Sequence, residues 1–181
     1  MSYLNCSSWD NLFMNICDTV AAKSKDRSTK IGCVIVGPDN EVRSMGFNGF
    51  PRGFKDKKPC TFIELEDGTK IPQLSLAREA EVIDLRFERP LKYKTTEHGE
   101  RNALYNAARV GIPMQGCTLY VNSLPPCVEC ARGIIQSGII KVVHVEAEIP
   151  ERWREDCAMA SEMLRECGIG IMTIKRKGKT T

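Results

Sequence analysis

Histidine and long apolar runs are scarce in this chain. Two of its 181 residues are His, so imidazole is available to very few metal sites. No stretch of 18 apolar residues and no export leader is visible, so we expect neither a membrane span nor secretion, and we expect a cytoplasmic location. The formal net charge of +3 is too small to indicate nucleic-acid binding by itself.

Cysteine, in contrast, is abundant, with nine residues. They are scattered and several lie in apolar runs, which favours free buried thiols over a disulfide framework in a chain without an export signal. Cys127 and Cys130 have the spacing of a metal-binding pair. We expect no second metal site at Cys60 and Cys117, because the other histidine, His144, lies within a predicted strand.

Hydrophobic periodicity predicts helices and strands along most of the chain. The predicted helices cover residues 8–24, 76–87, 97–110, 127–137 and 153–167. The predicted strands cover residues 31–36, 42–47, 117–121, 139–146 and 169–174, with a further small hairpin within 62–71. We expect Trp9 to face the core on the first helix, and Ala108 to do so on the third.

The order of these elements is typical of a layered α/β domain. The first two strands form a hairpin, and the later strands alternate with helices. Because the strands lack polar alternation, we expect both faces of the sheet to be covered. The length fits a single domain over residues 1–181, and residues 54–94 are predicted to be an insertion that shapes an entrance or an interface.

Two short clusters carry the groups that point to chemistry. His98 and Glu100 form an H-x-E motif, and Cys127 and Cys130 lie in a P-C-x-x-C motif. A catalytic zinc ion takes three protein ligands and a water, whose pKa falls to about 7. His98, Cys127 and Cys130 supply three ligands, and Glu100 is placed to move protons. Both clusters lie at predicted helix starts, where partial positive charge favours thiolate over thiol.

Two polar segments are candidates for binding a ligand. In Gly46–Gly53, three glycines and a proline surround Asn48, an arrangement that lets the backbone approach a ligand closely. The Asn48 amide can both donate and accept hydrogen bonds. In Lys25–Lys30, the cations are either a solvated edge or a phosphate clamp that uses Arg27 or Lys30.

These motifs resemble those of a known group of enzymes. H-x-E followed by P-C-x-x-C is the signature of zinc-dependent nucleobase deaminases. Gly46–Gly53 resembles the G-Y-N-G-x-P-x-G loop of deoxycytidylate (dCMP) deaminases, within the cytidine deaminase-like superfamily. The run Glu88–Lys94 leading to Glu97–Ala103 is also similar to members of that family. Two residues depart from it: Gly99 stands where most members have Ala, and Phe47 stands where the loop has Tyr.

The resemblance implies a fold and a reaction. The fold would be the three-layer cytidine deaminase-like α/β fold, with a central mixed five-stranded sheet and helices on both faces. The reaction would be hydrolysis of dCMP to dUMP and ammonia, which supplies dUMP for dTTP synthesis. Zn²⁺ would be held by His98, Cys127 and Cys130, and Glu100 would carry protons to N3 and to the leaving amine.

The resemblance also implies contacts to nucleotides. Asn48 would hold the sugar 3′-hydroxyl, Gly99 would lie at the pyrimidine carbonyl, and Arg27 would bind the substrate phosphate. Lys25 and Lys30 would meet that phosphate or a regulatory triphosphate. Activation by dCTP, inhibition by dTTP, Mg²⁺ on the triphosphate and assembly into a homohexamer are implied in the same way.

Alternatives remain open. Another deaminase of the superfamily would act on free nucleosides, guanine or tRNA adenosine, although the Gly46–Gly53 loop favours a nucleotide. A non-catalytic zinc-binding module would need a fourth ligand, and no further Cys or His has suitable spacing near either cluster. Such a module would also leave Glu100 without a role. The remaining alternative is a cluster of buried His and Cys that binds no metal.

Overall fold

The computed structural model of this chain describes residues 8–56, 62–64, 66–72 and 74–176. The chain divides into two compact units, one formed by the residues up to Gly49 together with those from His98 onward, and the other by Phe50–Glu97. The predicted single domain with an insertion around 54–94 remains a prediction. Cys60 lies outside the described residues.

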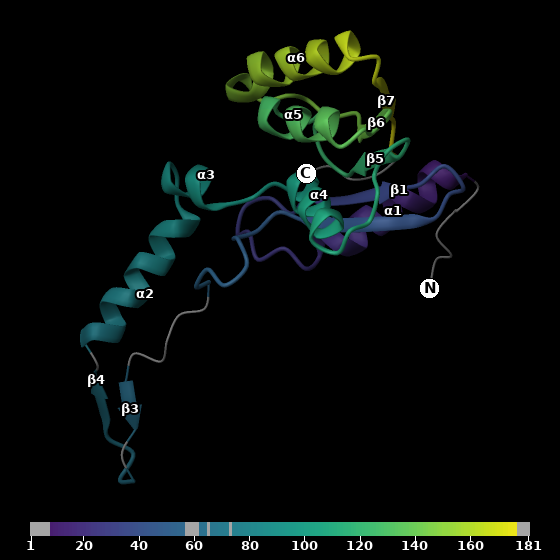
Figure 1. Cartoon of the computed structure of the whole chain (residues 1–181). Helices are drawn as coiled ribbons and strands as arrows, with labels where there is room; N and C mark the ends of the chain where they lie inside the picture. The colour runs from purple at the N-terminus through teal and green to yellow at the C-terminus, as the bar shows by residue number, and fades with distance from the viewer. Residues whose placement is uncertain (1–7, 57–61, 65, 73, 177–181) are drawn as a thin grey trace. The chain divides into compact units, whose positions relative to one another are not determined.

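A five-stranded sheet forms the centre of the first unit (Figure 1). Its strands, in spatial order, are β2 (Val42–Phe47), β1 (Gly32–Val36), β5 (Thr118–Val121), β6 (Lys141–Val145) and β7 (Gly170–Ile174). β1 pairs antiparallel with β2 and β5, whereas β5, β6 and β7 are parallel. The predicted mixed sheet is confirmed.

Helices cover both faces of this sheet. The helices in the described part of this unit are α1 (Trp9–Ala21), α4 (Gly99–Arg109), α5 (Val128–Gln136) and α6 (Glu151–Glu166). Phe13 of α1 packs with Val34 and Tyr120 on one face, whereas α4, α5 and α6 pack with Ile35 and Leu119 on the other. Because successive strand residues point to opposite faces, this arrangement confirms the predicted three layers.

Two glycines let helices approach the sheet closely. A Cβ on Gly32 would lie 1.9 Å from the Cys17 carbonyl oxygen of α1, and a Cβ on Gly46 would lie 2.3 Å from the Ala103 nitrogen of α4. Such distances exclude any side chain at these positions. Gly46 begins the Gly46–Gly53 segment, whose approach to a ligand stays a prediction. At Gly46 itself, the close neighbour in the structure is helix α4.

The outer edge of the sheet at β2 is occupied by side chains of α4. Asn102 Nδ2 donates to the Phe47 carbonyl at 2.8 Å, and Asn106 Nδ2 donates to the Met45 carbonyl at 2.8 Å. The two asparagines are four residues apart, which places them on the same side of the helix. They attach α4, and with it the His98 end of the helix, to the outer strand.

The second unit contains a small hairpin and two helices. These elements are β3 (Phe62–Glu64), β4 (Lys70–Pro72), α2 (Leu74–Phe87) and α3 (Leu91–Thr95). The predicted hairpin and the first of these helices are confirmed, whereas α3 was not predicted. Phe50 contacts the rings of Phe54 and Phe87, and Arg86 lies over the Phe54 ring.

Two predicted orientations are wrong. Trp9 is 57% exposed and stacks on Phe13 at the start of α1 instead of entering the core. Ala108 is exposed because the buried side of α4 runs through Ala103, Leu104 and Ala107, and Ala108 lies one further step around the helix. Among the described residues, we find no helix that is long and apolar enough to cross a bilayer.

Candidate metal centre

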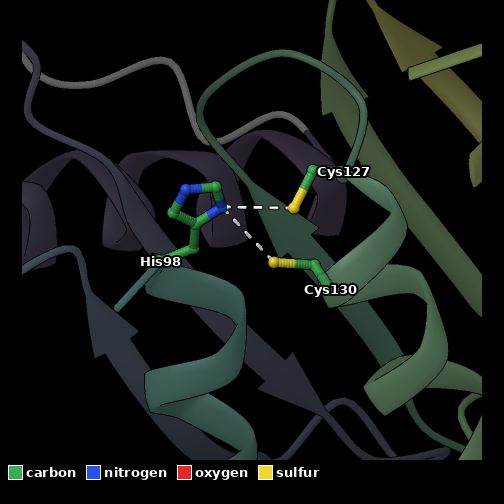
Figure 2. Close-up of side chains that lie close together, drawn as sticks. All are labelled: His98, Cys127 and Cys130. Atoms are coloured by element: carbon green, nitrogen blue, oxygen red, sulfur yellow. Dashed lines mark hydrogen bonds between the residues drawn. The ribbon is translucent and has the colours of Figure 1, made fainter. Parts of the chain in front are cut away.

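Three side chains converge where α4 and α5 begin. Figure 2 shows one nitrogen of the His98 ring directed at the sulfurs of Cys127 and Cys130. Nδ1 lies 3.4 Å from Cys127 Sγ and 3.5 Å from Cys130 Sγ. All three ligand atoms lie within 4.8 Å of one another. We call these residues, together with Glu100, the ligand corner.

The distances fit a tetrahedral metal site. With Zn–N bonds of about 2.05 Å and Zn–S bonds of about 2.3 Å, two ligands at a tetrahedral angle lie roughly 3.6 Å apart. The nitrogen–sulfur distances of 3.4 and 3.5 Å agree with this value. Among the described residues, no fourth His, Cys, Asp or Glu joins the group, so the corner has the ligand number of a catalytic site and not of a closed structural one.

Local structure explains how the ligands are presented. His98 and Cys127 were predicted in the first turns of their helices, but they occupy the N-cap positions of α4 and α5, with extended backbone angles. Neither side chain caps its own helix by a hydrogen bond. The two side chains are directed at one another, between the starts of the two helices (Figure 2). The helix dipoles favour negatively charged ligands at this place.

The protonation states are coupled within the corner. Hydrogen bonding with Cys130 lowers the pKa of Cys127, and the same bond, together with burial, raises the pKa of Cys130. The hydrogen bond with Cys127 raises the pKa of His98, in opposition to burial. Metal binding needs neutral imidazole and thiolates, so it must release protons from this group.

Glu100 is the fourth member of the corner. Its side chain lies in the first turn of α4 and is 4% exposed. Its Oε2 is buried and makes no hydrogen bond to any described residue. Burial raises the pKa of the Glu100 carboxyl, although the neighbouring His98 opposes this effect. A buried carboxylate oxygen without a partner is costly, and groups of this kind are common at functional sites.

Asn48 lies in a second polar group, which we call the polar loop and define as Ser24–Ile31 together with Asn48; its buried polar side chains are Ser24, Asp26 and Asn48. Asn48 Nδ2 donates to Asp26 Oδ2 at 3.2 Å and to the Thr29 carbonyl at 2.8 Å, and Oδ1 accepts from the Ile31 nitrogen at 2.8 Å. Both amide hydrogens are therefore in use. One lone pair of Oδ1 remains to accept a further hydrogen bond.

Asp26 organises the polar loop, and the sequence interpretation missed it. Its Oδ1 accepts from the Ser28 nitrogen at 2.8 Å, the Ser28 hydroxyl at 3.0 Å and the Thr29 nitrogen at 3.0 Å. Ser24 Oγ donates to the Asn48 carbonyl at 2.7 Å. The spacing Asp-x-Ser-Thr is typical of a turn closed by an aspartate side chain, and this signal was available in the sequence.

The basic side chains that were predicted to bind phosphate lie on the solvent-exposed side of the same loop. Lys25, Arg27 and Lys30 are exposed, whereas Asp26 is 7% exposed. Gly99 is buried at the start of α4, where a Cβ would lie 3.3 Å from the Ile31 carbonyl oxygen and 3.6 Å from the Asn48 nitrogen. The structure thus brings the polar loop against the helix that carries His98 and Glu100.

Comparison with known proteins agrees with this geometry. A family model described as the cytidine and deoxycytidylate deaminase zinc-binding region matches residues 7–146. The chain is 31% identical over 167 residues to an uncharacterized deaminase of Aliivibrio fischeri, covering 91% of this chain and 92% of that protein. It is 29% identical over 181 residues to the deoxycytidylate deaminase of Enterobacteria phage T4, covering 91% of this chain and 89% of that protein.

Vertebrate relatives are longer. The chain is 33% identical over 137 residues to the deoxycytidylate deaminase of Mus musculus, a match that covers 76% of this chain and 64% of that protein. Among solved structures, the fold is similar to that of dCMP deaminase from the cyanophage S-TIM5 in complex with dCMP and dUMP. The TM-score is 0.60 at 22% identity, with 90% of this chain and 94% of that chain covered.

The predicted resemblance to deoxycytidylate deaminases is confirmed by these matches. Zinc is supported from two sides, by the matched zinc-binding region and by the His/Cys/Cys group. Because the family model matches residues 7–146, which are most of this chain, the chain belongs to the cytidine and deoxycytidylate deaminase family and is an enzyme.

Proposed function

We propose that this enzyme hydrolyses dCMP to dUMP and ammonia at the ligand corner, with His98, Cys127 and Cys130 as the zinc ligands. The observation that carries the proposal is the convergence of these three ligand atoms beside the buried, unpartnered oxygen of Glu100. Similarity to deoxycytidylate deaminases from mouse and phage T4 supports the choice of substrate.

Zn²⁺, when bound, lowers the pKa of a coordinated water to about 7 and so supplies a nucleophile near neutral pH. Glu100 acts as the proton carrier of the reaction. In its ionised form it accepts a proton at Oε2 from the attacking water and donates it to N3 of the pyrimidine; it then accepts the second proton of that water, from the oxygen added at C4, and donates it to the amine, which leaves as ammonia. In the metal-free chain, burial raises the pKa of the Glu100 carboxyl.

The polar loop binds the sugar and phosphate in this proposal. The free lone pair of Asn48 Oδ1 accepts a hydrogen bond from the 3′-hydroxyl, while its other bonds fix the orientation of the amide. Arg27 binds the 5′-phosphate, with Lys25 and Lys30 as further cations on the exposed side. Gly99 presents its backbone to the pyrimidine carbonyl.

Further parts of the proposal rest on the family resemblance alone. They are supply of dUMP for dTTP synthesis in the cytoplasm, activation by dCTP, inhibition by dTTP, Mg²⁺ bound with the triphosphate, and a homohexamer. Ammonia release measured with each effector present and absent tests regulation. Sedimentation analysis at several protein concentrations tests the oligomeric state.

A substrate panel tests the main proposal. Zinc-loaded enzyme is assayed for ammonia release from dCMP, deoxycytidine, cytidine and guanine at equal concentrations. We expect the highest kcat/KM with dCMP, because only the nucleotide presents a phosphate to Arg27. Faster turnover of deoxycytidine or cytidine would show instead that the chain is a nucleoside deaminase. Tight zinc binding without turnover of any of these compounds would favour the non-catalytic module.

A further inference from the structure

Helix α6 directs three side chains of one face toward the ligand corner and the start of α5. Trp153, Asp156 and Cys157 are spaced at three and four residues, so they project from the same side of the helix. In Figure 1, α6 runs alongside α5, the helix that begins at the two cysteine ligands. Trp153 contacts His98 of the corner, and Asp156 and Cys157 contact the backbone on either side of Cys127.

Asp156 contacts the backbone between the two cysteines. Its Oδ2 accepts a hydrogen bond from the Val128 nitrogen at 3.1 Å. Helix α5 has no side-chain cap of its own, because its N-cap residue is Cys127. A free amide at a helix start needs an acceptor, and a carboxylate is favoured there by the helix dipole. Asp156 therefore acts as a cap supplied from another helix.

Cys157 contacts the chain just before the cysteines. Its Sγ donates to the Pro125 carbonyl at 3.6 Å. The side chain is 3% exposed, and burial raises its pKa to about 11. This thiol is not part of the group formed by His98, Cys127 and Cys130. It serves as a hydrogen-bond donor that fixes the Pro125 end of the turn.

Trp153 contacts the histidine ligand. The indole and imidazole rings lie with centroids 6.4 Å apart and an interplanar angle of 75°, an edge-to-face arrangement. Aromatic pairs at such distances and angles are favourable. Trp153 thus contacts the histidine, whereas Asp156 contacts the backbone next to Cys127. One helix therefore contacts both the His and the Cys parts of the proposed metal site.

We propose that this face of α6 positions the zinc ligands, with Asp156 as the principal positioning residue, held against the Val128 amide so that the two sulfurs keep their separation from His98 Nδ1. The inference rests on the proposed zinc site. In zinc proteins, groups that hold the ligands in place without touching the metal typically change affinity by 10- to 100-fold when removed.

Zinc affinity of three variants, measured by competition with a chromogenic chelator, tests the proposal. Asp156→Ala removes the acceptor, Asp156→Asn keeps an oxygen acceptor without charge, and Glu155→Gln is the exposed control on the same helix. We expect about 10- to 100-fold weaker zinc binding for Asp156→Ala, a smaller loss for Asp156→Asn and no change for Glu155→Gln. The Co²⁺-substituted Asp156→Ala protein should also show an altered d–d absorption spectrum.

The outcomes separate the two hypotheses. A wild-type chain that binds no zinc would overturn the proposed function together with this inference. A wild-type chain that binds zinc no more tightly than Asp156→Ala, with the same Co²⁺ spectrum, would overturn the inference alone. If Asp156→Ala does not fold, Trp153→Leu removes the ring contact to His98. Zinc affinity equal to wild type in that variant would overturn the role assigned to α6.

Discussion

The ligand corner and the polar loop each bury polar side chains, yet they differ in the hydrogen bonds that these side chains make. In the polar loop, the carboxylate of Asp26 and the amide of Asn48 are held by hydrogen bonds within the chain. In the ligand corner, Glu100 Oε2 has no partner among the described residues. Two sulfurs there approach one imidazole nitrogen.

The difference separates a structural role from a chemical one. Buried polar groups that hydrogen-bond to one another stabilise a single conformation. In the polar loop, Asp26 and Asn48 do this. Buried groups that converge without full pairing raise the free energy of the folded chain and are retained where a ligand completes them. Substitutions in the two regions should therefore affect different measurements.

Loss of a metal ligand should have the largest effect. We expect Cys130→Ala to lose bound zinc and deaminase activity, because two ligands cannot hold the ion at a catalytic site. Metal content by elemental analysis and ammonia release check this prediction. Cys167→Ala, which removes an exposed thiol, is the matched control and should keep both. Full zinc content in Cys130→Ala would mean that a different residue ligates.

Removing the carboxylate of Glu100 should leave the metal in place. We expect Glu100→Gln to lower kcat by about 10²- to 10⁴-fold, the usual contribution of a general acid–base group, with zinc content unchanged. Steady-state kinetics with dCMP measure the effect. Glu162→Gln, at an exposed position on α6, should behave as wild type. Activity retained in Glu100→Gln would assign proton transfer to another group.

The same variant should reveal the unfavourable burial of Glu100 in metal-free protein. Because the folded-state pKa is raised, the folded chain binds the proton more tightly, and wild type loses stability as pH rises from the unfolded-state pKa of about 4.3. Glu100→Gln lacks this loss. Its advantage in urea unfolding should be absent near pH 4, grow as pH rises and then remain level. An advantage that is independent of pH would contradict the assignment.

Substitution in the polar loop should change stability. Asp26→Ala leaves the Ser28 and Thr29 amides and the Asn48 amide without their acceptor. We expect a loss of about 1 to 3 kcal/mol in the free energy of unfolding, the usual penalty for unpaired buried groups. Asp39→Ala, at an exposed turn, should stay within about 0.5 kcal/mol of wild type. Equal stability of the two variants would show that the network adds nothing.

The boundary between the two regions should tolerate a small change. Gly99→Ala places a methyl group 3.3 Å from the Ile31 carbonyl oxygen, a tight contact. Overpacking of about 1 kcal/mol is offset by a similar gain in helix propensity of roughly 0.5 to 1 kcal/mol. We therefore expect a small net change, measured by urea unfolding. Gly46→Ala is the contrast, since its Cβ would overlap α4 backbone.

The helices and strands with local signals, and the convergence of three side chains, could be predicted from the sequence. The apolar runs of β1 and β6 identified buried strands, and glycines marked helix ends. The two motifs around His98 and Cys127 predicted which three side chains converge in the structure, because their spacing is typical of residues that bind one metal ion. That these residues and Glu100 act in catalysis stays a prediction, although their side chains lie where it requires.

Contacts between distant segments could not be predicted. Asp156 reaches an amide 28 residues earlier in the chain, and no periodicity in either segment indicates that pairing. The exact helix starts were also missed, because an N-cap residue and a first-turn residue look alike in sequence. Trp9 was expected in the core because apolar spacing gives the side of the helix on which a residue lies, but not whether the first turn of that helix is covered by other elements.

The asparagines that α4 directs at β2 have a consequence for assembly. An outer strand normally offers free carbonyls as a template on which another strand can add. Here the carbonyls of Met45 and Phe47 already accept bonds from Asn106 and Asn102. Addition of a further strand at the β2 edge is thus disfavoured, because the helix that begins beside His98 occupies the carbonyls on which such a strand would pair.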